Sequence, residues 1–553
     1  MSNNKSKYKP NTLFGLLKSL GWNPATRDDK EILDALREGK ELEEIYGLTE
    51  EGLLDPFFEF LDEAGVAECL KELEQKDYQR VMVSIVLLTI TYMVKILIGV
   101  PSMNAMPNLL FAKTSIMRII GFNARVLDEG ICERGEHARN KENEAPTPFS
   151  TQMLSDFVER FRPQEVEKLF NSIVQALAKF GAFDDKINAI IDGSDLETTE
   201  KYKNCGSVTR IKKDKDKNGN IVKTKVTVYG FKIIAIIDVK TQIPIAVKVV
   251  KINNHESNYT FDLIKTAIRN LKGHVIIDTI VADRGFLDGQ DLYKIKNDLE
   301  VSFIVPGKKD MEIYKEARKI ALSKEEDPEI VVKKTRTKTE KNEKLKTVVA
   351  GVKNLNFLDS YCSEEDFKHK NSKDFSPEPL NAVAVLEWDN KEYYTPEKGV
   401  VFITNKDVDE PFTVFDDYDD RSLIENLLFR ETKQGWHLEK SPKKSFKAMT
   451  AHAILTMMTH ALTLAYRDHK KEEYQKQKEE EQLRHRAFKL GSRRWRQEIK
   501  KDENDYIIIF IGEKYGILHV AEFATMGGFK VRQAPEGMKT IKEIYETRGL
   551  NFE

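Results

Sequence analysis

The chain has 553 residues, which is too long for one ordinary domain, so two or three folding units are expected. Its 88 basic and 90 acidic residues give a net charge of -2, so a nucleic-acid surface would require local segregation of charge. The 4 cysteines form no C-x-x-C pair and the N-terminus lacks the order of a secretory signal. These features argue against a zinc site, a disulfide framework and export, and they favour a reducing cytoplasm.

Residues 1–180 are predicted to form a helical N-terminal region, because apolar residues recur there at spacings of three and four. The stretch from Val81 to Val100 is the one that resembles a membrane span. Lys95 lies inside it, and the apolar run before Lys95 is too short to span a membrane. We therefore expect a buried core helix and no membrane partner.

From Lys186 the pattern changes to strands separated by turns and then by helices. Three strands followed by alternating helices and strands predict an α/β fold, with a mixed sheet covered by helices. The expected strands are 186–192, 226–239, 243–252, 274–283 and 301–306, and the expected helices are 258–271 and 287–297.

Residues 307–415 interrupt this order and are predicted to form an inserted β-rich subdomain. They contain a basic run from Lys333 to Lys346, which could either hold phosphates or be a solvated segment. Two helices are expected after the insertion. A charged helix and a small, hairpin-containing C-terminal unit are then expected within 468–553.

Three acids stand out as candidates for shared chemistry. Asp192 and Asp283 end two apolar strands, where an acid is expected to be paired, hydrogen-bonded or bound to a metal. Glu425 lies on one helix face with Tyr418 and Arg421. Three carboxylates suit Mg²⁺ or Mn²⁺, and two such ions could support displacement at phosphorus. Asp195 is an alternative for the first position.

The segments "IIDGSDLETT", "VADRGFLDG" and "YDDRSLIE" resemble the three acidic motifs of the DDE transposases, particularly the insertion-sequence-4 group with its Tyr-Arg-Glu-Lys signature. The resemblance covers residues 186–467. It implies a ribonuclease H-like catalytic core formed by 181–306 and 416–467, interrupted by the insertion, and cut-and-paste movement of DNA. Residues 1–180 would then recognise the DNA ends.

The resemblance also implies roles for single residues. The metal-binding and catalytic triad would be Asp192, Asp283 and Glu425, holding two Mg²⁺ ions that Mn²⁺ could replace. Residues contacting DNA would be Tyr418, Arg421, Lys433, Arg284 and Trp388. The implied partners are double-stranded DNA, as terminal inverted repeats and target, and a second copy of the chain in a synaptic complex. The implied setting is the prokaryotic cytoplasm, at the nucleoid.

One departure from the family pattern concerns the lysine. In the family it follows the glutamate by seven residues, but Thr432 occupies that position here and the lysine is Lys433. One extra residue rotates a side chain by about 100° around a regular helix. We therefore predict a single-turn π-bulge near "NLLFR", which would return Lys433 to the catalytic face.

Several alternatives remain at this point. Trp388 could stack on an unpaired base or pack within a strand core. For Trp436 a packing role is the favoured interpretation. His255 and Glu256 could approach a metal or cap a helix. Asp278 is expected to face a partner or the sheet surface. The whole chain could also be a metal-dependent nuclease without strand transfer, or a catalytically silent DNA-binding relative.

Overall fold

The computed structural model describes residues 12–22, 29–40, 54–73, 83–122, 126–127, 130, 148–215, 221–323, 327, 329–340, 343–372, 375–395, 397–488, 497–501, 506–511 and 514–519. The chain divides into two compact units. The first contains Met1–Ala25 and Glu50–His469, and the second contains Thr26–Thr49 and Lys470–Glu553.

The N-terminal part of the first unit is helical, as the sequence predicts. Helix α5 (Ile85–Leu97) is its most buried element, and every side chain from Ile85 to Ile96 is buried, including Lys95. Among the described helices none is long and apolar enough to cross a membrane, and the expectation of a core helix is confirmed. The other helices are α1 (Leu13–Ser19), α3 (Leu54–Glu63), α4 (Val66–Lys71), α6 (Thr114–Ile120), α9 (Thr151–Arg160) and α10 (Pro163–Phe180), with the single turns η1 (Met103–Ala105) and η2 (Pro107–Phe111).

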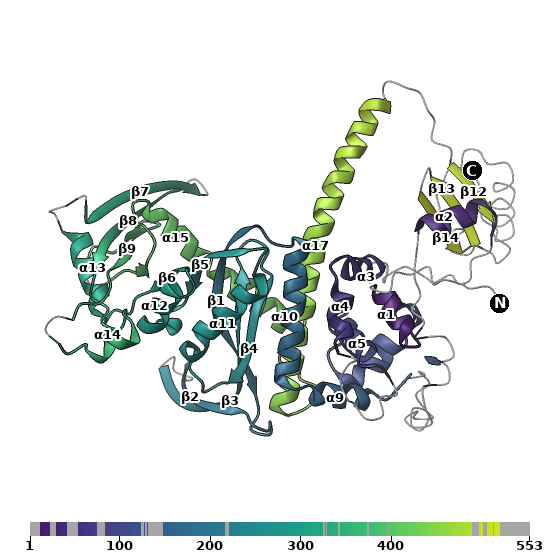
Figure 1. The fold of residues 1–553 in the computed structure, drawn as a ribbon, viewed down its shortest axis with the longest axis horizontal. Helices are drawn as coiled ribbons and strands as arrows, with labels where there is room; N and C mark the ends of the chain where they lie inside the picture. Colours follow the sequence, from purple (N-terminus) through teal and green to yellow (C-terminus); the bar gives the residue numbers. More distant parts are fainter. Residues whose placement is uncertain are drawn as a thin grey trace. The chain divides into compact units, whose positions relative to one another are not determined.

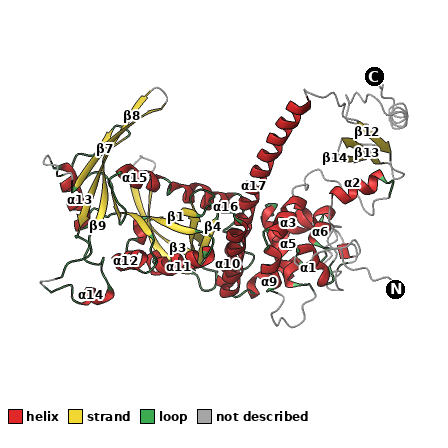
Figure 2. Ribbon diagram, turned by 45° about the horizontal axis from the view of Figure 1, so that its top comes forward, coloured by secondary structure: helices red, strands yellow, loops and turns green. Residues whose placement is uncertain are grey.

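A mixed sheet follows, with helices on both faces (Figure 2). Its strands pair in the order β2-β3-β1-β5-β6, and β4 pairs with β3. β1 is parallel to β5 and β5 to β6, whereas β3 is antiparallel to its neighbours. The elements are β1 (Lys186–Thr198), β2 (Gly206–Lys215), β3 (Ile221–Asp238), β4 (Pro244–Lys251), η3 (Glu256–Tyr259), α11 (Thr260–Leu271), β5 (Ile276–Ala282), α12 (Gly289–Asn297) and β6 (Ser302–Pro306).

The predicted alternation of strands and helices is confirmed, but two details were wrong. β1 does not end at Asp192 and continues to Thr198, because residues through Thr198 remain paired with β3. Strand β2, from Gly206 to Lys215, was not predicted from the sequence; it pairs with Ile221 to Gly230, the first part of β3.

The strands within 307–415 join the same sheet rather than forming a separate one (Figure 1). The order continues β6-β11-β9-β8-β7, so the described strands of this unit make one 11-stranded sheet. β11 is antiparallel to β6, with Phe402 opposite Pro306. The elements are α13 (Glu312–Leu322), β7 (Val331–Glu340), β8 (Glu343–Leu355), α14 (Glu364–Lys368), β9 (Leu380–Trp388), β10 (Lys391–Glu392) and β11 (Val401–Thr404).

The helices that return to the sheet carry the third motif. They are α15 (Pro411–Asp419), the π-helix η5 (Ile424–Phe429), α16 (Arg430–Gln434) and the 43-residue α17 (Phe446–Phe488). Arg336 of β7 donates two hydrogen bonds to Asp416 of α15, at 2.7 and 2.8 Å, and lies over the Phe412 ring. Part of the basic run 333–346 therefore anchors α15 to the sheet.

The second unit combines segments from both ends of the chain. Its strands β12 (Gln497–Lys501), β13 (Tyr506–Ile511) and β14 (Lys514–His519) form an antiparallel sheet, which includes a hairpin in the expected tail. Leu33 and Leu36 of α2 (Asp29–Arg37) share a small core with Ile508 of this sheet. Helix α2, grouped with the N-terminal helices by its sequence, therefore packs in this unit.

Candidate active site

Asp192 and Asp283 lie at neighbouring positions on parallel strands. The last backbone pair between β1 and β5 is Ile191 with Ala282, so the next residue on each segment is an aspartate. Asp283 then precedes η4 (Arg284–Phe286), a short 3-10 turn, whereas β1 continues past Asp192. The sheet topology therefore brings the first two predicted acids together.

Arg421 connects the third acid to the first. Its Nη1 donates to Asp192 Oδ2 at 3.0 Å, and its Nη2 contacts Glu425 Oε1 at 3.3 Å. Asp192 is nearly buried, whereas the Glu425 side chain is 57% exposed. One guanidinium thus lies between two carboxylates that are far apart in sequence, at a place where a cation is electrostatically favoured.

The pKa of Asp192 reflects this crowded environment. Burial raises its pKa to about 7, because the ionised carboxylate loses water. The N–H of Gly193, which donates to Asp192 Oδ1 at 2.7 Å, and the charge of Arg421 lower the pKa, while Glu425 and Asp283 raise it further. Burial is the largest of these effects.

The helix that carries Glu425 contains the predicted π-bulge. Residues Ile424–Phe429 form a π-helix, η5, before the α-helical turn α16. Thr432, seven residues after Glu425, is fully buried and donates its hydroxyl to the Leu428 carbonyl at 2.6 Å. The extra residue is absorbed by the π-turn, and the prediction of a bulge is confirmed.

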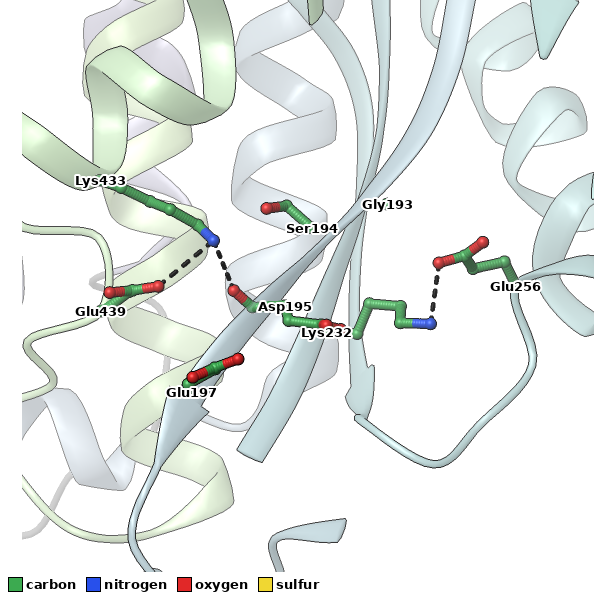
Figure 3. A pocket seen from close by; sticks show the side chains of 8 residues that line it. All are labelled: Gly193, Ser194, Asp195, Glu197, Lys232, Glu256, Lys433 and Glu439. Carbon is green, nitrogen blue, oxygen red and sulfur yellow. Dashed lines mark hydrogen bonds and ion pairs between the residues drawn. The ribbon is translucent and has the colours of Figure 1, made fainter. Parts of the chain in front are cut away.

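Lys433 reaches strand β1 rather than the carboxylates themselves. Its Nζ donates to the backbone carbonyl of Asp195 at 2.6 Å and lies 3.3 Å from a Glu439 carboxylate oxygen. It lines a pocket of about 440 Å³ beside β1, where Lys232 and Glu256 approach from the other side (Figure 3). The remaining lining residues are Gly193, Ser194, Asp195, Glu197 and Glu439.

A family model described as "Transposase DDE domain" matches residues 185–462, which is half of the chain and contains all three acids. The chain belongs to the DDE-domain transposase family. Among solved structures, one similar chain is that of a piggyBac transposase synaptic complex with hairpin DNA. The two sequences are 11% identical, the TM-score is 0.33, and the alignment covers 74% of this chain and 72% of the other. A search of curated proteins gives no match.

The residues of this transposase that were predicted to contact DNA differ in their exposure and packing. Tyr418 is half-buried, its ring lies 4.4 Å from that of Phe402, and burial raises its pKa. Arg284 is exposed and follows Asp283 directly. Trp388, at the end of β9, packs edge-on against Phe415 at 4.8 Å, a contact that favours the packing interpretation.

The transposase's other acidic candidates have partners of their own. Asp195 contacts Arg210, which also binds Glu197 at 3.1 Å, and Asp278 pairs with Lys186 at 2.7 Å. His255 caps η3 by accepting the N–H of Ser257. Across the described part of the chain, no group of three His, Cys, Asp or Glu side chains is arranged to hold a metal ion.

The donor chemistry nevertheless fits a divalent cation. Carboxylate oxygens of Asp192 and Glu425 already contact one positive charge, that of Arg421. The β1–β5 register places Asp283 next to Asp192. Oxygen ligands of this type are those that Mg²⁺ and Mn²⁺ prefer. Lys232 of β3 and Glu256 of η3 form an ion pair in the pocket beside β1. Lys232 could not be singled out from the sequence, because a lysine within a long strand resembles any exposed strand residue.

Proposed function

We propose that this transposase binds the terminal inverted repeats of a mobile DNA element, cleaves phosphodiester bonds at its ends and joins them to target DNA. The observation that carries the proposal is the meeting of Asp192 and Asp283 at the end of the β1–β5 ladder, with Glu425 connected to Asp192 through Arg421. The match of the DDE-domain family to the same segment supports it.

The strand order β4-β3-β1-β5-β6, with three antiparallel strands followed by two parallel ones, supports a ribonuclease H-like core. The spacing of Tyr418, Arg421 and Glu425, together with the π-helix before Lys433, supports placement in the insertion-sequence-4 group. We assign end recognition to residues 1–180, and we infer a homodimer, because two DNA ends must be joined. The inferred location is the prokaryotic cytoplasm, at the nucleoid.

Within this proposal Asp192, Asp283 and Glu425 hold two Mg²⁺ ions, for which Mn²⁺ can substitute. The ions would supply activation of a water or 3′-hydroxyl and stabilisation of the leaving oxygen. Arg421 neutralises two carboxylates in the DNA-free chain, and its planar guanidinium is suited to binding two phosphate oxygens. Arg284 directly follows Asp283, and the pKa of Tyr418 is raised by burial and, to a smaller extent, by the charge of Asp283. In this proposal both residues contact the DNA backbone, and Lys433 contacts it from the pocket beside β1.

The test uses the full chain, Mg²⁺, a pair of DNA ends and a target plasmid. We expect end cleavage and joined products from the wild type, and loss of both from Asp192→Ala, Asp283→Ala and Glu425→Ala. Cleavage without joined products would identify a nuclease without strand transfer. Tight DNA binding without any metal-dependent turnover would identify a catalytically silent relative.

A further inference from the structure

The backbone ladder that aligns Asp192 with Asp283 ends one residue before them. Ile191 and Ala282 are the last paired residues, after which β1 continues and the other segment turns into η4. Ladder hydrogen bonds therefore do not fix the spacing between the two acids. Because metal sites require ligand positions accurate to about half an ångström, another contact has to fix it.

The Glu256 carboxylate lies across this gap. A Cβ on Gly193, the residue after Asp192, would lie 2.7 Å from Glu256 Oε1. A Cβ on Gly285, two residues after Asp283, would lie 2.8 Å from Glu256 Oε2. One carboxylate thus occupies the room left by the glycines of both acidic motifs, with one oxygen against each.

Lys232 holds this carboxylate in place. Its Nζ lies 2.8 Å from Glu256 Oε1, and both side chains are largely buried, at 15% and 21% exposure. Lys232 stands opposite Asp195 in the β1–β3 ladder, so it belongs to the strand that pairs with β1 (Figure 3). The pair therefore ties β1, β3 and η4 together at one point.

Glu256 and the acidic triad lie on opposite faces of the sheet. Successive residues of a strand point to opposite faces, so Gly193 faces away from the side on which Asp192 meets Arg421. Glu256 approaches from the face of Gly193, ahead of α11, while Glu425 approaches with η5. Glu256 is placed to support the acids from behind.

We propose that Glu256 is a positioning residue of the acidic site. Its carboxylate, held by Lys232, fixes the separation of Asp192 and Asp283 where the ladder no longer does. Gly193 and Gly285 are needed because any side chain there would displace it. This inference rests on the proposed function, and it concerns residues outside the acidic triad.

The test measures Mn²⁺ affinity of the full chain without DNA, by calorimetry. Since supporting residues of metal sites typically contribute about 10- to 100-fold in affinity, Glu256→Ala is expected to weaken binding at least about tenfold. Glu256→Gln keeps the shape but loses the ion pair, and an intermediate loss is expected. Glu167→Ala is the matched control: Glu167 forms an ion pair with Lys248 at 3.0 Å and is 20% exposed, but lies away from the acids. It should bind Mn²⁺ as the wild type does.

Two further variants separate positioning from direct ligation. Gly193→Ala should weaken Mn²⁺ binding in the wild-type chain but add no loss to Glu256→Ala, because the space is then empty. Lys232→Met should also weaken binding, whereas a Glu256 that bound the metal directly would keep or gain affinity when released from Lys232. Multiplicative losses for Gly193→Ala and Glu256→Ala, or wild-type affinity in Lys232→Met, would contradict the proposal.

Wild-type Mn²⁺ affinity in Glu256→Ala overturns the positioning role while leaving the proposed function intact. Absence of Mn²⁺ binding by the wild type would instead contradict the proposed function, and the positioning role with it. Thermal unfolding of each variant accompanies the binding measurement. A variant that unfolds early without a change in Mn²⁺ affinity has only a structural role, and this result also counts against the proposal.

Discussion

Replacing Lys95 by methionine should stabilise the first unit at neutral pH. Lys95 is 2% exposed on α5, and burial lowers its pKa from 10.5 to about 8, with a smaller contribution from the charge of Lys440. A shift of this size corresponds to a cost of about 3 kcal/mol for keeping the amine charged in the folded chain. The ammonium lies 5.4 Å from the centre of the Tyr92 ring, a contact that offsets about 1 kcal/mol.

The expected net gain for Lys95→Met is therefore about 2 kcal/mol at pH 7. The sign follows from the lowered pKa: the cost is fully present below about 8 and disappears as the pH rises to 10.5, where the unfolded chain also loses its proton. The gain should shrink over this interval and vanish near its upper end.

The assay is equilibrium urea unfolding of both chains at pH 7, 8.5 and 10, followed by circular dichroism of the helices. Comparing the two chains at each pH cancels the titration of all other groups. Lys71→Met, at an exposed position on α4, is the control and should change stability by less than about 0.5 kcal/mol. A variant less stable than the wild type at pH 7, or a gap independent of pH, would refute the reasoning.

Three further predictions concern the acids and their helix. Mn²⁺ at about 100 times its dissociation constant should stabilise the wild type by about 2.7 kcal/mol, whereas the stability of Asp192→Asn should not change. Thermal unfolding with and without Mn²⁺ measures this difference, and equal stabilisation of both chains would count against the metal site. Arg421→Lys should reduce cleavage at least about tenfold with DNA affinity nearly retained, because one ammonium cannot bridge two carboxylates, and unchanged turnover would argue against the bridge. Deleting Asn426 should remove the π-turn and preserve activity. Inserting an alanine after Asn426 should instead rotate Lys433 by about 100° and reduce activity. An insertion variant more active than the deletion variant would contradict the role of the π-helix.

The sequence predicted the parts of the fold that rest on strong apolar patterns. The second part of β3, from Gly230 to Asp238, is largely buried, as are β4, β5 and β6, and α11 has a clear apolar face. The order of these elements could therefore be read directly from the sequence. Asp192 and Asp283 were identifiable because each follows an apolar run, and Glu425 because it recurs with Tyr418 and Arg421 at spacings of three and four. The extra residue before Lys433 also made the π-helix predictable.

The missed elements depend on pairing with distant segments. β2 has the composition of a solvated loop, and it becomes a strand through its ladder with β3. The stretch after Asp192 begins with Gly193 and Ser194, which suggest a turn, but backbone pairing keeps it extended to Thr198. Glu256 could not be placed from sequence, because its contacts with Gly193 and Gly285 connect three separate motifs.

The most direct test of the central claim is to locate the metal. Crystals of the full chain with DNA ends and Mn²⁺ should show anomalous density about 2.1 Å from carboxylate oxygens of Asp192 and Asp283, with Glu425 completing the site. Arg421 should then contact a phosphate instead of both carboxylates. Manganese bound elsewhere, with Arg421 still joining Asp192 to Glu425 beside the bound DNA, would contradict the assignment of these acids as the catalytic centre.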